Sequence, residues 1–195
     1  MNRRQLAIAT IGIVVLIVAA AVAWYVTHPS RQLQNASQSP IVGKAKVGQI
    51  APEFQASTTG GFFDLAKTDK PVFLEVFATW CPHCQRETAV LDKLYAAYGS
   101  RVAFVAVSGS DTAMDNTSES SPLDVLNFAK QFNVRYPIAY DPLIREPNNP
   151  ESVANLYLQG AFPTIAVIGK DKKVTYLETG EISYDDLAAQ IKKVL

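Results

Sequence analysis

Histidine and cysteine are both scarce in this chain of 195 residues, with two of each. A structural zinc site needs four ligands, and His28 lies far along the sequence from His83, so the composition argues against a zinc knuckle. Both cysteines, Cys81 and Cys84, belong to one C-x-x-C motif. A structural disulfide within the chain would therefore consume the motif, which points instead to a dithiol that reacts.

An excess of charge is also absent. Lysine and arginine number 18, as do aspartate and glutamate, so the formal net charge is zero. A nucleic-acid-binding domain normally carries a basic surface, and we therefore expect no nucleic acid among the partners. The sequence shows no internal repeat, and its 48% hydrophobic content is enough for the core of one globular domain.

Charged residues are missing from one long stretch near the N-terminus, Leu6 to Val26. About 20 apolar residues span a bilayer as a helix, and Trp24 and Tyr25 stand where an interfacial belt would lie. Arg3 and Arg4 precede the stretch, so the positive-inside rule places the N-terminus in the cytoplasm and the rest of the chain outside it. The sequence predicts a single-pass membrane anchor with an extracytoplasmic domain.

A cleaved signal peptide is the alternative, because Ala21 to Ala23 resembles a small-residue cleavage site. The apolar run is longer than the core of a usual signal peptide, which favours a retained anchor. No cysteine stands at the end of the run, which removes a lipoprotein. We divide the chain into an anchor or signal peptide (1–26), a flexible, polar linker (27–45) and a folded domain (46–195).

The folded domain is organised around a buried strand that ends in the dithiol. Val72 to Phe77 is apolar apart from Glu75, as expected for a central strand covered on both faces. After Cys84, apolar residues recur at helical spacing until Gly99, a C-terminal stop signal. Cys81 would thus lie at a helix N-terminus, where free N–H groups and the helix dipole favour a thiolate.

Further elements follow the same rules of periodicity and capping. A strand over Val102–Val107 would complete a parallel βαβ unit with the central strand. Residues 109–121 are polar and predict an exposed loop, and the following helix would bury Leu123, Leu126, Ala129 and Phe132. The remaining expected elements are a hairpin (54–57 and 62–65), a strand (136–140), a loop (141–150), a short helix (152–158), a second hairpin (164–168 and 174–178) and a last helix from Ser183 that buries Leu187, Ala188, Ile191 and Leu195.

Three of these stretches together resemble the thioredoxin superfamily. They are the strand and helix around Trp80-Cys81-Pro82-His83-Cys84, the segment Gly160-Ala161-Phe162-Pro163-Thr164 before an apolar strand, and Lys46 to Phe54, which is similar to the entry segment of the membrane-anchored TlpA/ResA-like, or redoxin, branch. The resemblance covers roughly residues 45 to 195. It implies an α/β thioredoxin-like fold with a central mixed sheet flanked by helices, an N-terminal hairpin, and a helical insertion between residues 109 and 157.

The resemblance also implies a division of labour between the two cysteines. Disulfide exchange needs an accessible thiolate, Cys81, and a covered resolving thiol, Cys84. His83 could donate a hydrogen bond or a positive charge to the Cys81 sulfur and lower its pKa. No cofactor is expected besides the Cys81–Cys84 disulfide itself.

Two acids accompany the dithiol. Glu75 stands where the superfamily carries its buried acid, and alternation places it on one face with Phe73 and Phe77, where burial would raise its pKa. It could pass a proton to or from Cys84. Glu87 matches an acid of the TlpA/ResA-like branch and is a candidate modulator, although its spacing also suits an exposed acid in the first helical turn.

The residues around the dithiol are candidates for substrate binding. Pro163, if cis as in the superfamily, would leave backbone groups of Phe162 to pair with an extended substrate. Trp80 and Phe162 could form an apolar ledge or cover the core. The expected substrate-binding residues are Trp80, Pro82, Phe162 and Thr164.

The leading function is a membrane-tethered thiol-disulfide oxidoreductase acting on exported proteins that carry thiols or disulfides, with a membrane or extracytoplasmic redox partner that recycles the dithiol. Cys-Pro-His-Cys matches the motif of DsbA-like oxidants, so we expect a redox potential closer to DsbA than to thioredoxin. The alternative is a TlpA/ResA-like reductase, for example one that keeps apocytochrome c reduced. A peroxidase and a copper-binding chaperone are weaker alternatives, the latter because no histidine follows His83.

Overall fold

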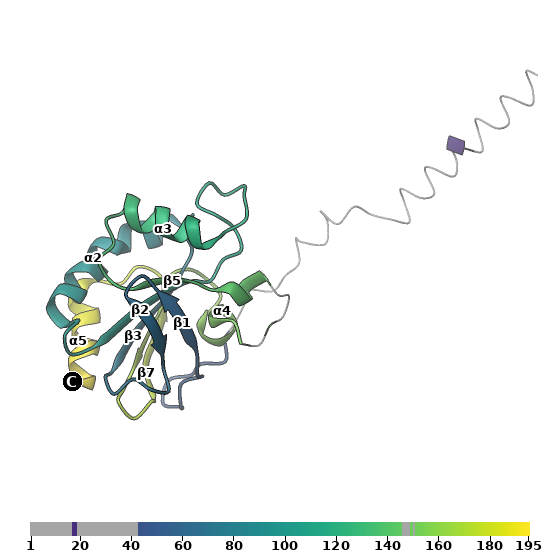
Figure 1. Cartoon of the computed structure of the whole chain (residues 1–195). Helices are drawn as coiled ribbons and strands as arrows, with labels where there is room; N and C mark the ends of the chain where they lie inside the picture. Colours follow the sequence, from purple (N-terminus) through teal and green to yellow (C-terminus); the bar gives the residue numbers. More distant parts are fainter. Residues whose placement is uncertain (1–16, 19–42, 146–148, 150) are drawn as a thin grey trace, which may run out of the picture. The chain divides into compact units, whose positions relative to one another are not determined.

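The computed structural model describes residues 17–18, 43–145, 149 and 151–195 (Figure 1). The predicted anchor therefore lies outside the described residues except for Ile17 and Val18, as does the predicted linker up to residue 42. Within the described ranges, none of the helices has the length and apolar character required to cross a membrane.

Seven strands in the described part of the chain form one mixed sheet in the order β2-β1-β5-β4-β3-β6-β7. The central strand β3 is parallel to β4 and antiparallel to β6, and the hairpin of β1 and β2 occupies one edge. The strands are β1 (Gln55–Thr58), β2 (Gly61–Asp64), β3 (Val72–Phe77), β4 (Ala103–Ser108), β5 (Ile138–Tyr140), β6 (Thr164–Ile168) and β7 (Val174–Thr179).

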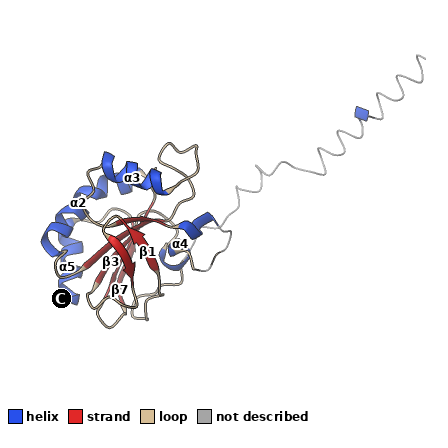
Figure 2. Cartoon of the chain, viewed as in Figure 1, coloured by secondary structure: helices blue, strands red, loops and turns tan. Residues whose placement is uncertain are grey.

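Helices cover the sheet on both faces, which gives the thioredoxin-like architecture predicted from the sequence (Figure 2). The helices α2, α3 and α5 pack on one face and α4 on the other. The helices are α2 (Pro82–Tyr98), α3 (Pro122–Gln131), α4 (Val153–Tyr157) and α5 (Tyr184–Val194), with a 3₁₀ turn, η3 (Pro142–Arg145).

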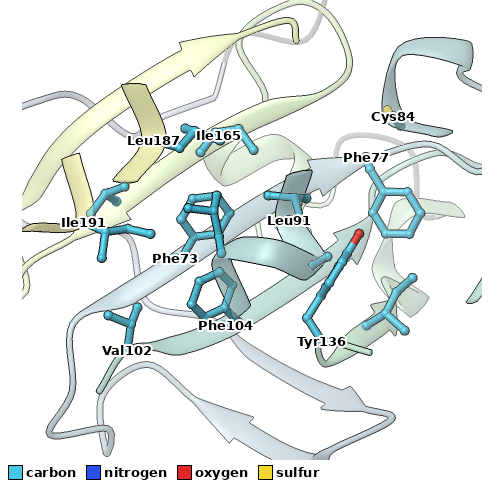
Figure 3. Close-up of a cluster of buried hydrophobic side chains, with 14 of the residues drawn as sticks. Phe73, Phe77, Cys84, Leu91, Val102, Phe104, Tyr136, Ile165, Leu187 and Ile191 are labelled. Carbon is cyan, nitrogen blue, oxygen red and sulfur yellow. The ribbon is translucent and has the colours of Figure 1, made fainter. Parts of the chain in front are cut away.

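The strand β3 is buried along its whole length and separates two apolar clusters. Phe73 and Phe77 face the cluster under α2 and α5 (Figure 3), whereas Val72, Leu74 and Val76 face the cluster under α4. This alternation follows from the two-residue period of a strand. It confirms that Glu75 lies on the same face as the two phenylalanines, beside Tyr136.

Capping and periodicity predict most element boundaries correctly. The helix α2 begins after Cys81 and ends at Gly99, and Ser121 accepts a hydrogen bond from the Asp124 N–H at the start of α3.

Residues 43 and 45, within the predicted linker, already belong to the fold. The N–H of Ala45 donates to the Leu156 carbonyl at 2.8 Å, and Ala45 is buried.

The predicted buried face of α3 is correct in part, since Ala129 and Phe132 are partly buried and pack against the core, but it is wrong for the two leucines. Leu123 and Leu126 are 64% and 51% exposed, and Val125 and Phe128 are buried instead. The helix has apolar residues on more than one face, so its periodicity allows both orientations. The aromatic contacts of Phe128 with Phe77 and Phe132 accompany the observed orientation. Leu126 then lies beside a groove of about 430 Å³ that runs along β1 and β5.

Two smaller expectations also fail. Leu195, at the end of the chain, is 43% exposed rather than buried. The loop 109–121 is not fully exposed, because Ser110, Ala113 and Ser120 are buried. Ser110 accepts a hydrogen bond from Trp80, in the segment that leads into the dithiol.

Candidate active site

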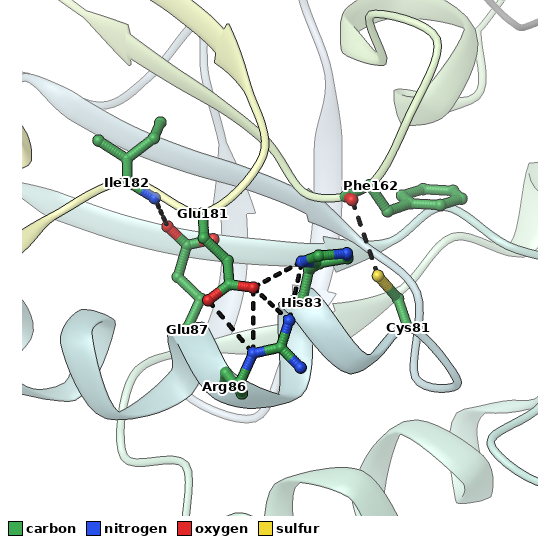
Figure 4. Close-up of polar contacts among 7 residues, drawn as sticks. All are labelled: Cys81, His83, Arg86, Glu87, Phe162, Glu181 and Ile182. Carbon is green, nitrogen blue, oxygen red and sulfur yellow. Dashed lines mark hydrogen bonds and ion pairs between the residues drawn. The ribbon is translucent and has the colours of Figure 1, made fainter.

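The dithiol lies at the junction of β3 and α2. Cys81 is the N-cap residue of α2 and Pro82 its first residue, a position that favours proline. Both cysteines are free thiols. Cys81 was expected to be accessible, but it is only 4% exposed, because the proline loop covers it. Its Sγ lies 3.7 Å from the Phe162 carbonyl oxygen (Figure 4).

The surroundings of Cys81 favour its thiolate. A hydrogen bond from the Cys84 thiol lowers the pKa of Cys81 most, and burial opposes this effect. The backbone N–H groups of Cys84 and His83 and the charge of the His83 side chain contribute further, so the pKa of Cys81 falls to about 6. The N–H groups at the helix N-terminus thus lower the Cys81 pKa as expected, whereas the His83 imidazole makes the smallest of these contributions to that pKa.

Cys84 has the opposite environment. It is 1% exposed, and burial raises its pKa above the ordinary range, with further increases from Cys81 and from the charge of Glu75. The two thiols are therefore unequal in the way that a nucleophile and a resolving thiol must be, since Cys81 ionises readily and Cys84 holds its proton.

Two carboxyl groups lie in the protein interior near the thiols. Glu75 is 2% exposed, and burial raises its pKa well above the ordinary range, with added repulsion from Glu87 and Cys81. Nearby Tyr136 is also buried, and its pKa is raised, chiefly by burial and then by Glu75. A buried carboxyl group with a raised pKa can exchange a proton with the neighbouring thiols.

Glu87 is buried as well, so the alternative of an exposed acid in the first turn is excluded. Its Oε1 accepts a hydrogen bond from the Ile182 N–H at 3.2 Å, while Oε2 has no hydrogen-bond partner among the described residues. Burial raises the pKa of Glu87 to about 7 despite that hydrogen bond. Its charge therefore changes near neutral pH.

The His83 side chain pairs with two residues that the sequence did not indicate. Its Nδ1 lies 2.5 Å from Oε1 of Glu181, and Arg86 Nε donates to Oε1 and Oε2 of the same carboxylate at 3.1 and 3.3 Å. Arg86 Nη2 also contacts this carboxylate. These contacts are drawn as dashed lines in Figure 4. Nδ1 of His83 thus contacts Glu181 and, at 2.9 Å, Nη2 of Arg86. The contact of the Cys81 sulfur is with Phe162.

The proline loop has the conformation that the resemblance implies, with a cis bond between Phe162 and Pro163. The Phe162 ring meets Trp80 edge-to-face, with centroids 6.1 Å apart, and both side chains are partly exposed. Pro82 is exposed. These three residues can contact a substrate.

Thr164 does not fit the substrate-binding role proposed for it. It is completely buried, and its hydroxyl donates to the Ala161 carbonyl at 2.9 Å and accepts from the Gln159 N–H at 3.2 Å. The side chain therefore holds the proline loop in place and cannot reach a bound substrate.

Residues from the loop before α3 and from the first turn of α3 support the segment that leads into the dithiol. Trp80 Nε1 donates to Ser110 Oγ at 2.8 Å, and Thr79 Oγ1 donates to Asp124 at 2.6 Å. Asp124 also accepts from the Met114 N–H at 3.0 Å. No local motif marks Ser110 or Glu181, and Asp124 is marked only as the acid in the first turn of a helix. All three come close to the segment around the dithiol only through the fold.

The described residues contain no group of three or more histidine, cysteine, aspartate or glutamate side chains that could hold a metal ion. The arrangement can exchange disulfides, because it combines an ionisable thiol at a helix N-terminus, a second thiol one turn further along the helix, and a buried acid near both thiols.

Comparisons with known proteins agree with this chemistry. The Redoxin family model matches residues 46–194. The thiol-disulfide oxidoreductase ResA of Geobacillus thermodenitrificans is 30% identical over 151 residues, which cover 76% of this chain and 78% of that protein. ResA of Bacillus cereus strain ZK/E33L is 28% identical over 156 residues, covering 77% and 80%.

The thioredoxin domain of the thiol-disulfide oxidoreductase BVU-2223 from Bacteroides vulgatus has a similar structure. The TM-score is 0.60 at 20% identity, over 78% of this chain and all (100%) of that domain. At this identity the likeness concerns the fold alone.

Proposed function

We propose that this chain reduces disulfides of exported proteins. The chain belongs to the redoxin family and is a thiol-disulfide oxidoreductase of the ResA-like branch, and the proposal proceeds from that premise. The inequality of the two thiols supports disulfide exchange, and the observation that carries the reductase direction is the size of the Cys81 pKa. The pKa of Cys81 is lowered to about 6, whereas that of Cys84 is raised by burial.

In the first step the Cys81 thiolate attacks one sulfur of a substrate disulfide. The substrate S–S bond breaks, a Cys81–substrate disulfide forms, and the released substrate thiolate takes up a proton. Trp80, Pro82 and Phe162 border the sulfur and would contact the substrate chain. Because Cys81 is nearly covered, the Phe162 contact has to open for this attack.

In the second step Cys84 loses its proton and attacks Sγ of Cys81. The enzyme disulfide forms, and the second substrate sulfur leaves as a thiolate that is then protonated, so two electrons pass from the enzyme dithiol to the substrate. The pKa of Cys84 is raised, so this step needs a base. Glu75 faces the same interior and is our candidate for that base, in its ionised form.

The direction of exchange follows from the stability of the reduced state. A thiolate that is more stable makes the disulfide more oxidising. The nucleophile of thioredoxin has a pKa of about 7 and that of DsbA about 3.5, and the value of about 6 for Cys81 lies nearer thioredoxin. The similarity to ResA proteins supports the same direction. These observations favour the reductase over the oxidant that Cys-Pro-His-Cys alone suggests.

A measurement of the redox potential tests the direction. The difference between pKa values of about 6 and about 7 corresponds at neutral pH to about 1 kcal/mol, or roughly 20 mV, of the 150 mV that separate thioredoxin from DsbA. We expect the purified protein, equilibrated with glutathione, to have a potential of roughly −250 mV. Thiol trapping in cells should find the dithiol mostly reduced. A potential near about −120 mV with a mostly oxidised dithiol would favour the oxidant.

The membrane tether is part of the proposal and is supported by the uncharged run from Leu6 to Val26 behind Arg3 and Arg4. The catalytic domain would then lie in the periplasm or outside the cell, with a membrane or extracytoplasmic partner that re-reduces the dithiol. Protease added to intact cells or spheroplasts should remove the domain. Recovery of a soluble protein with a new N-terminus near Trp24 would instead indicate a cleaved signal peptide.

A further inference from the structure

Glu181 occupies a position that the fold fixes from two sides. It lies between β7 and α5, and the N–H of its neighbour Gly180 donates to the Pro163 carbonyl at 2.8 Å. The N–H of its other neighbour, Ile182, donates to Glu87 at 3.2 Å. One anchor thus belongs to the proline loop and the other to α2, so the Glu181 side chain is held over the first turn of the helix that carries the dithiol (Figure 4).

From this position the carboxylate contacts the side chains of His83 and Arg86, which lie in the first two turns of α2. His83 Nδ1 is 2.5 Å from Oε1, and Arg86 Nε is 3.1 and 3.3 Å from the two oxygens. The three side chains remain partly in solvent, with 59% of His83, 55% of Arg86 and 40% of Glu181 exposed. The cluster is therefore a surface feature beside the dithiol, and its effect should be of the size expected for a screened charge.

A count of charges shows what the cluster does to Cys81. With Glu181 ionised and Arg86 protonated, the cluster carries zero charge when the imidazole is neutral and +1 when it is protonated. Without the Glu181 charge these values become +1 and +2. If loss of the partner also removes the imidazole proton, the net charge stays at +1. Through its own charge and its two partners, Glu181 can thus make the field at the helix N-terminus less positive but not more positive, and its smaller effect on Glu87 opposes this change.

The other titratable groups near Cys81 lie at other positions, and one of them, Glu87, also responds to the cluster, because the Glu181 charge contributes to the raised pKa of Glu87. Glu75 acts from β3, and Cys84 and Glu87 act from the buried side of α2. Exchanging the exposed Glu181 carboxylate for an amide of the same shape leaves these groups in place.

We propose that Glu181 is a positioning residue that holds His83 and Arg86 in an ion-pair cluster, compensates their charge, and thereby makes the Cys81–Cys84 dithiol a stronger reductant than its Cys-Pro-His-Cys motif suggests. The proposal rests on the reductase function above and explains how a chain with this motif can serve it. Less positive charge at the helix N-terminus stabilises the Cys81 thiolate less, and the reduced state gives up its electrons more readily.

The test replaces Glu181 with glutamine in the full-length protein and measures two quantities. One is the ionisation constant of Cys81, followed by the ultraviolet absorbance of its thiolate. The other is the equilibrium constant with glutathione. A surface charge near a helix terminus changes such constants by roughly two- to fivefold. We expect E181Q to raise the ionisation constant and to shift the glutathione equilibrium toward the dithiol by that factor.

Two further variants separate charge compensation from a structural effect. E178Q removes the same charge from the exposed Glu178 on β7, and it should leave both constants unchanged. The double variant R86Q/E181Q restores the charge count of the unmodified cluster, so it should return both constants toward their original values. A merely structural role for Glu181 predicts no such return.

The outcomes also distinguish this inference from the proposed function. Constants that stay the same in E181Q, or that change equally in E178Q, overturn the inference even if the unmodified protein reduces protein disulfides. If the unmodified protein instead equilibrates as a strong oxidant, the reductase function fails, and the comparison of E181Q with R86Q/E181Q still decides whether Glu181 compensates charge.

Discussion

Replacement of Glu87 with glutamine should change how the stability of the protein depends on pH. Glu87 is buried under the loop that carries Ile182, and it keeps one hydrogen bond, to the Ile182 N–H. Glutamine can accept the same hydrogen bond through its carbonyl oxygen but cannot ionise. The variant therefore isolates the effect of the carboxylate charge in the folded protein.

The size of the effect follows from the pKa. Burial raises the pKa of Glu87 from 4.5 to about 7 in the folded protein, whereas in the unfolded chain it stays near its ordinary value. The folded state thus binds the proton more tightly, and stability is lost as the pH rises from about 4.5 to about 7. Between pH 5 and pH 8 the original protein should lose roughly 2 to 3 kcal/mol relative to Glu87→Gln.

Urea unfolding at several pH values measures this difference. Both proteins should carry Cys81→Ser, so that ionisation of Cys81 does not contribute to the pH dependence of stability. Burial, the largest cause of the raised Glu87 pKa, remains in this background. Glu178→Gln in the same background is the control, and its stability should follow that of the unmodified background at every pH. A difference between the Glu87 variant and its parent that is the same at pH 5 and pH 8 would refute the raised pKa.

Three further outcomes test the roles of individual residues. Cys84→Ser should accumulate covalent complexes with substrate proteins on non-reducing gels, and Cys81→Ser should accumulate few or none; equal trapping contradicts the assignment. Glu75→Gln should slow the resolution of a mixed disulfide by roughly 10²-fold in stopped-flow measurements and leave its formation less affected; equal rates would remove the proposed base. Asp124→Ala should destabilise the fold by about 1 to 3 kcal/mol in urea, because it leaves the Thr79 hydroxyl, at 0% exposure, without its acceptor.

Local signals were sufficient for most of the secondary structure. The apolar run of β3, the proline after the Cys81 cap and the serine caps of α3 and α5 each depend on neighbours within a few residues, so the sequence contains the information needed. The face of α3 was different. Periodicity identified an amphipathic helix but not which of its apolar faces would pack on the sheet, because that choice depends on aromatic contacts made with a distant strand.

The same distinction explains why the motif alone and the folded structure favour different directions of exchange. The sequence places a potential cation, His83, one residue before Cys84, and a cation beside a thiolate favours an oxidant. Whether that charge acts on the sulfur depends on its other partners. The partner in the structure, Glu181, lies 98 residues further along the chain. Its position is set by the hydrogen bonds of Gly180 to the proline loop and of Ile182 to Glu87, which form only in the folded sheet. On the proposal made here, the dithiol motif specifies which sulfur reacts first, while the distant loops that pack around the helix N-terminus adjust how strongly the dithiol oxidises or reduces.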